Sequence, residues 1–95
     1  MLFRSQALRI AVNDELGSLS ALLRSLPSCL MRGGRVAILS FHSGEDRLVK
    51  AAFKTGLQDG TYASIATEVI RAGADERRDN PRSSAAKLRF AIRRA

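Results

Sequence analysis

Large aliphatic residues recur at spacings of three and four through the first third of the chain: Leu8, Val12, Leu16, Leu19, Leu23, Leu26 and Leu30. This period places them along one side of a helix. Pro27 lacks a backbone N–H, so it should kink or end that helix near Ser25, and Gly17 could divide it earlier. The pattern predicts an N-terminal helix with one buried face, stopped by Gly33 and Gly34.

An uninterrupted apolar run, Val36 to Leu39, forms the middle of the next segment, residues 35–41. A strand that is buried on both faces has this composition, which is typical of a parallel sheet covered by helices. Gly33-Gly34 precedes this strand, whereas a phosphate-cradling loop follows one. We therefore interpret the two glycines as a turn and not as part of a cofactor site.

A second helix is predicted directly after this strand. Ser43 can cap its first turn, and Glu45 and Asp46 suit that turn because carboxylates are favourable at the positive end of a helix dipole. The apolar spacing predicts that the helix ends at Gly56 or Gly60.

The rest of the chain predicts two further strands. Residues 62–70 are rich in β-branched side chains, residues 73–86 are polar and predict a loop, and residues 87–94 alternate. In that last segment Leu88, Phe90 and Ile92 point to one face, while Arg89 and Arg93 point to the other. The expected fold class is α/β: a single domain over residues 1–95, with about three strands and two to three helices packed on them.

Charge changes the picture at the C-terminal end. The 95 residues carry a formal net charge of +7, and the segment from Arg71 onward contains eight basic residues but only three acidic ones. A positive surface of this kind attracts phosphate backbones through counterion release. It is also a common way to keep a protein soluble, so charge alone leaves nucleic-acid binding and a solvated surface equally open.

The first candidate site is the turn from Ser40 through Phe41 and His42 to Ser43. It follows the carboxyl end of a buried strand, where ligands gather in open α/β sheets. His42 is the single histidine, and a general base is chemically possible there. In the competing interpretation Ser43 caps the helix and His42 bonds to nearby backbone.

The second candidate is a basic turn that begins at Asn80-Pro81. Asn-Pro favours an extended turn, and Arg82, Ser83, Lys87 and Arg89 follow it, with Arg93 and Arg94 at the end of the chain. Guanidinium, ammonium and hydroxyl groups on such a turn suit phosphate contacts. The alternative is an ordinary basic edge strand, kept from aggregating by its charges.

A polar ridge is the third candidate. Gln6, Arg9 and Asn13 fall at spacings of three and four, so they would share one face of the predicted helix. Such a ridge is usually solvated, but it could also contact a ligand or a neighbouring loop.

Several function classes find no support in the sequence. It has no G-x-G-x-x-G, Walker loop, C-x-x-C or H-E-x-x-H motif, so no cofactor-binding or metal-binding residues are predicted. Its one cysteine excludes an internal disulfide. No stretch reaches the roughly 20 apolar residues of a membrane span, and we expect a cytoplasmic protein.

Three segments together resemble the bacterial MraW/RsmH family, S-adenosylmethionine-dependent methyltransferases that modify a cytosine N4 in small-subunit ribosomal RNA. They are residues 6–16 (QALRIAVNDEL), residues 33–47 (GGR, then SFHSGEDR) and residues 80–89 (NPRS, then AKLR). The polar positions that match are Gln6, Arg9, Asn13, Ser40, Ser43, Glu45, Asp46, Arg47 and Asn80. Each segment is moderately specific alone, and the three occur in the family's order.

The resemblance implies the C-terminal portion of a Rossmann-like methyltransferase, with the final strand inserted antiparallel between the other two. The family's glycine-rich loop, its acidic ribose-binding residue and its motif around the target amine would all lie upstream, outside this chain. The chain differs from the family pattern at Ser5, Gly44, Ser84-Ala85 and residues 68–78. The resemblance implies that the chain is a truncated or split rRNA methyltransferase that is inactive alone and binds no S-adenosylmethionine by itself.

Two other functions stay open beside that one: a non-catalytic basic RNA-binding module, and a protein-interaction module. Ribosomal RNA is the expected partner. Because the strand over residues 35–41 would lose a parallel neighbour in the absent half, its edge should also be covered by a second copy, a companion chain or a rearranged N-terminal segment.

Overall fold

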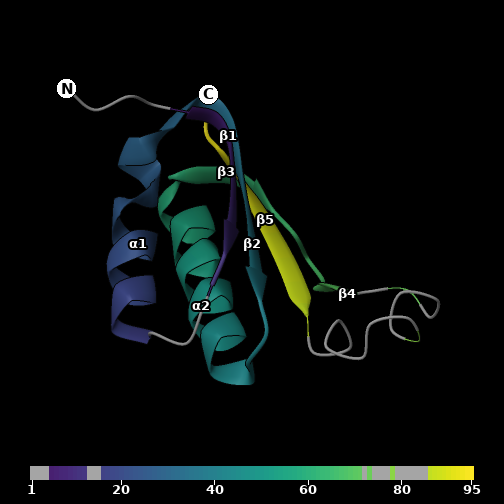
Figure 1. The fold of residues 1–95 in the computed structure, drawn as a ribbon. Coiled ribbons are helices and arrows are strands. Elements are labelled where there is room, and N and C mark those ends of the chain that lie inside the picture. Colours follow the sequence, from purple (N-terminus) through teal and green to yellow (C-terminus); the bar gives the residue numbers. More distant parts are fainter. Residues whose placement is uncertain (1–4, 13–15, 72, 74–77, 79–85) are drawn as a thin grey trace.

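The computed structural model of the chain describes residues 5–12, 16–71, 73, 78 and 86–95. The elements in this part follow the order β1 (Ser5–Ala11), α1 (Leu16–Cys29), β2 (Leu30–Ser40), α2 (Ser43–Asp59), β3 (Tyr62–Ile65), β4 (Ile70–Arg71) and β5 (Lys87–Arg93). Figure 1 shows the strands as one twisted sheet with both helices beside it.

The sheet is mixed, and its strand order is β1-β2-β5-β3, with β4 also paired to β5. β1 and β2 run parallel, whereas β5 is antiparallel to β2, β3 and β4. The predicted α/β class is confirmed, as is the insertion of the final strand between the two earlier ones. The predicted strand over residues 62–70 is interrupted: β3 and β4 are two short strands that pair with different parts of β5.

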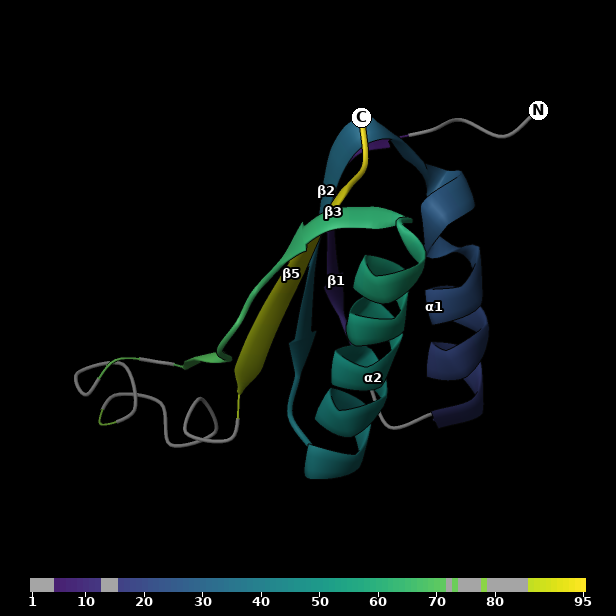
Figure 2. The ribbon, with the colours of Figure 1, turned by 180° about the vertical axis from the view of Figure 1, so that it is seen from behind.

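Both helices pack on the same face of the sheet, as the opposite views in Figures 1 and 2 show. The core lies between the helices and the sheet and consists of Val12, Leu19, Leu23, Leu26, Leu30, Val36, Ile38, Val49, Phe53, Tyr62 and Ala91. Phe53 from α2 meets the ring of Tyr62 edge-on, with 5.5 Å between the ring centroids. This contact fixes the end of α2 against β3.

The single N-terminal helix predicted from the leucine spacing is wrong for residues 5–11, which form β1. In β1, Leu8 and Ile10 face the core while Arg9 and Ala11 are exposed. Side chains along a strand point to the same face at every second residue. The spacing of Leu8 from the leucines of the later helix therefore matches a helical period only by coincidence. Gln6 and Arg9 are therefore on opposite faces of a strand and do not form a helical ridge.

The expected end of the N-terminal helix also changes. α1 continues to Cys29, so Pro27 lies inside its last turn instead of ending it near Ser25. A proline this late in a helix disturbs only the bonds of the preceding turn, and burial of Leu26 and Leu30 holds the end of the helix in place.

Gly33 and Gly34 are part of β2 and do not form a separate turn before it. The pairing of β1 with β2 is irregular at this point, passing from Ser5–Leu30 to Ala7–Arg35. Gly33 has φ 77°, and a Cβ on Gly34 would lie 2.8 Å from the Met31 carbonyl oxygen and 3.0 Å from that of Ser5. Only glycine fits such a bulge.

β2 is buried on one face and not on both. Its fully buried residues Val36, Ile38 and Ser40 alternate with half-buried Ala37 and Leu39. In β5, Arg89, Ala91 and Arg93 occupy the helix-facing positions, and Leu88, Phe90 and Ile92 the opposite ones. The uninterrupted apolar run in β2 thus reflects two different surroundings, the core and a second apolar strip on the other face.

The expected open edge at residues 35–41 does not occur. β2 is paired on one side with β1 and on the other with β5. Of the three coverings that we considered, an N-terminal segment of the same chain is the one observed. β1 becomes the edge strand of the sheet.

Among the described residues, no helix is both long enough and apolar enough to cross a membrane.

Candidate functional site

The carboxyl ends of β1 and β2 meet at one edge of the sheet. The backbone N–H of Val12 donates to the carbonyl of Leu39 over 2.9 Å, so the chain leaves both strands at the same level. On the other side of β2, Ser40 is the register partner of Lys87, the first residue of β5. One residue from each of the three motif segments, Val12, Ser40 and Lys87, therefore lies at this edge. Asn13, Asn80, Arg82 and Ser83 lie outside the described residues.

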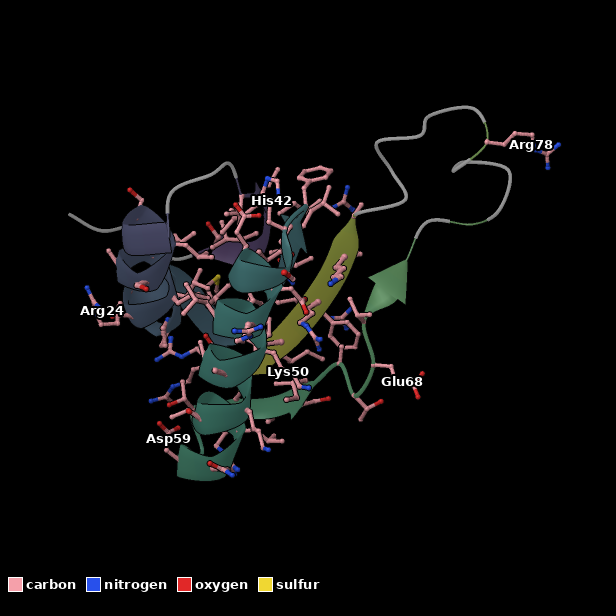
Figure 3. The ribbon with its side chains drawn as sticks, turned by 90° about the horizontal axis from the view of Figure 1, so that it is seen from below. Arg24, His42, Lys50, Asp59, Glu68 and Arg78 are labelled. Carbon is pink, nitrogen blue, oxygen red and sulfur yellow. The ribbon has the colours of Figure 1, made fainter. Side chains whose placement is uncertain are left out.

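His42 lies at this edge, directly before α2, and its side chain is exposed (Figure 3). It is the N-cap residue, with φ −127° and ψ 145°, and its carbonyl accepts the backbone N–H of Asp46 at 3.1 Å. The prediction that Ser43 caps the helix is wrong, because Ser43 already has helical geometry and is exposed.

Glu45 holds the turn in place. Its carboxylate accepts the backbone N–H groups of Phe41 and His42, at 3.2 and 3.3 Å, and the residue is 1% exposed. A glutamate at the third helical position commonly bonds back to the N-cap backbone. Burial gives this bond a fixed geometry, so the position of His42 depends on Glu45.

Asp46 reaches across to β5. Its two carboxylate oxygens accept hydrogen bonds from Nε and Nη2 of Arg89, at 2.7 and 3.1 Å. The side chains of the pair are only 12% and 11% exposed. Such a two-pronged pair is strong and directional, and it ties the first turn of α2 to the middle of β5.

The hydrogen bond from Arg89 holds the pKa of Asp46 below its usual value of 3.8, and the positive charges of Arg89, Lys87 and Lys50 add to this effect, while partial burial opposes it. The stability that the pair contributes is therefore complete above about pH 4 and is lost as the pH falls through the lowered pKa.

At pH values below about 4, we expect the urea midpoint of the wild-type chain to fall more steeply with decreasing pH than the midpoint of Asp46→Asn, because the variant lacks this titration. Urea unfolding from about pH 2.5 to about pH 7 measures the effect. Parallel curves for the two proteins would contradict it.

Arg93 and Arg94, which were also proposed for RNA contact, bind backbone carbonyl groups. Arg93 donates from its guanidinium to the carbonyl of Leu30. Arg94 is exposed and donates from Nε to the carbonyl of Gly60 at 2.8 Å. With Arg89 they fix β5 to β2 and to both ends of α2, which gives these arginines a structural role whether or not they meet RNA.

The remaining motif residues do not gather at one point. Ser40 is buried at the end of β2, while Arg9, Ser43 and Arg47 are exposed. Gln6 lines a hollow with Gly33 and Arg35, near the opposite end of β1 from the turn that carries His42. Within the described segments, no three His, Cys, Asp or Glu side chains are grouped so that they could hold a metal ion.

The structure also shows a basic pocket that the sequence analysis missed. It has a volume of about 310 Å³, lies between α2 and the segment after β3, and includes Lys50, Lys54 and Arg89 in its lining. The signal in the sequence was the pair of lysines four residues apart on a helix, outside the apolar stripe of that helix.

The parallel pair β1–β2, the helices that follow it and the polar turn at its carboxyl edge define part of an α/β unit of the methyltransferase type. A family model described as the MraW methylase family matches residues 3–94. The chain belongs to this family, which confirms the resemblance in the three motifs.

Curated relatives agree with that assignment. The chain is 52% identical over 88 residues to a ribosomal RNA small subunit methyltransferase H 1 from Lachnoclostridium phytofermentans. It is 54% identical over 88 residues to a methyltransferase H 2 from Alkaliphilus metalliredigens. The matches cover 93% of this chain but only 24% and 25% of the two relatives, so the chain spans about a quarter of their length.

Proposed function

We propose that these residues supply the substrate-facing part of an S-adenosylmethionine-dependent rRNA cytosine-N4 methyltransferase that acts in the cytoplasm, and that they transfer no methyl group by themselves. The methyl donor would be bound by the remaining part of the family fold, from a companion segment or chain. The transfer requires that the methyl group of the donor and the amine of the cytosine are held in line, so catalysis is largely a matter of positioning.

One observation carries this proposal: a residue from each of the three motif segments lies at the carboxyl edge of the parallel pair. The bond from Val12 to Leu39 and the register of Ser40 with Lys87 place His42 beside the ends of three strands. This edge is where open α/β sheets bind their ligands. A nucleobase that reaches the edge would meet the exposed side chains of Phe41, His42 and Ser43.

The carboxylates near the turn do not suit a bound methyl donor. A nucleoside cofactor on such a sheet is usually held by a carboxylate that bonds its ribose hydroxyls. In the described part of this edge, Glu45 is bonded to the backbone of its own turn and Asp46 is bonded to Arg89. This supports a donor site made by residues other than these two.

The test is a chimera of the Alkaliphilus relative in which the 88 matched residues are replaced by the corresponding residues of this chain. We expect it to transfer methyl groups from S-adenosylmethionine to small-subunit rRNA at a rate within about tenfold of the parent rate. A tenfold loss would correspond to about 1.4 kcal/mol in the activation barrier. The isolated chain should show no heat of binding with S-adenosylmethionine by titration calorimetry.

His42→Ala in the chimera should lower methyl transfer by about tenfold or more, as expected for a lost positioning contact. Gln58→Ala, an exposed residue near the other end of α2, is the matched control and should leave the rate unchanged. A chimera that folds but transfers no methyl group would contradict the proposal, as would micromolar binding of the donor by the isolated chain.

A further inference from the structure

The basic pocket between α2 and the segment after β3 combines positive charge with an apolar floor. Lys50, Lys54 and Arg89 line it, and Thr67 contributes a hydroxyl. Both lysines are exposed. Figure 3 shows Lys50 on the side of α2 that faces β5, while Arg24 lies on the far side of the molecule.

The two lysines stand in an unfavourable arrangement. They are four residues apart on one helix, where two like charges destabilise the helix by about 0.2–0.5 kcal/mol. No ion pair joins either lysine to an acid within the described residues. Glu68 follows Thr67 in sequence, but its side chain points away from Lys50 in Figure 3. The Asp46 carboxylate is taken up by Arg89, so the pocket keeps an excess of positive charge.

The floor of the pocket can accept a flat or apolar group. Phe53, which is 2% exposed, and Leu57, which is 40% exposed, supply the apolar part of its lining from α2. Ile65 closes the side toward β3. A ligand with anionic groups joined by less polar rings would satisfy both the lysines and this surface.

We propose that this pocket binds the phosphodiester backbone of an RNA strand whose target base lies at the His42 turn. This inference rests on the proposed function for the class of substrate and adds a second contact to it. Twelve residues separate His42 from Lys54 on α2, about 18 Å at 1.5 Å per residue. A strand stacked as in a duplex, with about 3.4 Å per nucleotide, covers that distance in about five nucleotides.

The experiment uses the 95-residue chain and a fluorescent single-stranded RNA of about twelve nucleotides, titrated from about 50 to about 300 mM salt. The double variant Lys50→Ala/Lys54→Ala should bind about tenfold more weakly at low salt. Its slope of log affinity against log salt should be shallower by about 1.4, since each phosphate contact to a single strand contributes about 0.7.

Arg24→Ala/Arg32→Ala is the matched control, because it removes the same charge from two exposed positions outside the pocket. It should leave the slope within about 0.3 of wild type. Lys50→Arg/Lys54→Arg should bind like wild type. A thermal melt of each variant at the lowest salt concentration checks that it is folded, so weak binding cannot be mistaken for unfolding.

Three results would overturn the inference: an unchanged slope in the lysine variant, an equal loss in the control variant, or displacement of the RNA by inorganic phosphate as effectively as by unlabelled RNA. Methyl transfer by the chimera separates this inference from the proposed function. If the chimera carrying Lys50→Ala/Lys54→Ala methylates rRNA with an unchanged KM, the pocket inference falls and the proposed function stands.

Discussion

Replacing Asp46 with alanine is expected to lower the free energy of unfolding by about 2–4 kcal/mol. The change would leave the Arg89 guanidinium beneath α2 with no carboxylate to accept its two hydrogen bonds. Breaking a fully buried pair costs about 3–5 kcal/mol, and the slight exposure of this one reduces the penalty. A small domain has only about 5–15 kcal/mol in total, so the variant should be near the limit of folding.

Urea unfolding at neutral pH measures this effect. Asp59→Ala is the control, because Asp59 is exposed and its carboxylate accepts the backbone N–H of Thr61, just two residues away. Its effect should be much smaller. The double variant Asp46→Leu/Arg89→Met should recover part of the loss, since an apolar pair leaves no charge without a partner. Equal midpoints for Asp46→Ala and Asp59→Ala would show that the pair contributes little.

Removal of residues 1–11 is expected to turn the chain into dimers or larger assemblies. Without β1, the backbone groups of β2 from Arg35 to Leu39 would lose their partners at an edge whose central residues carry no charge. An exposed, flat, apolar edge strand pairs readily with another chain. The loss of Leu8 and Ile10 would at the same time open the core beneath α1.

Sedimentation velocity at about tens of micromolar, a range where exposed hydrophobic edges associate, distinguishes the outcomes. A synthetic peptide of residues 5–12, added in trans, should restore the monomer, while a peptide of the same composition in scrambled order should not. A truncated chain that stays monomeric and melts at the wild-type temperature would show that β1 is dispensable.

Much of the fold could be predicted because local signals agreed with the tertiary structure. The segment after β2 begins a helix with two acids in its first turn and ends at Gly60, whose φ of 89° is the left-handed geometry that glycine favours at a helix end. The place of β5 between β2 and β3 came from the family resemblance, because no local property of residues 87–93 specifies their neighbours.

The N-terminal error has a physical cause. Leu8, Ile10 and Val12 alternate with Ala7, Arg9 and Ala11, which is the pattern of a strand. Leu8 and Val12 are also four residues apart and continue smoothly into the stripe of α1. Short apolar segments fit both periods, and only pairing with the distant residues 35–39 decides between them.

The candidate site was harder to predict than the fold. The side chains of Arg89 and Arg93 look free for RNA in sequence, yet their partners are Asp46 and the Leu30 carbonyl, 43 and 63 positions away. Contacts over such separations leave no local trace. His42 could be placed at the sheet edge from sequence, because a residue between a strand and a helix has few other places to lie.

The position of β5 also governs how the molecule opens. Among the described strands, β3 and β4 join the sheet through β5 alone. β5 in turn pairs with β2 across separations of up to 57 residues, from Arg35 to Ile92. Pairing over such distances forms late and slowly during folding. Any fluctuation that frees β5 must also free β3 and β4, so the backbone amides that these two strands bond to β5 cannot resist hydrogen exchange longer than β5 itself stays in place.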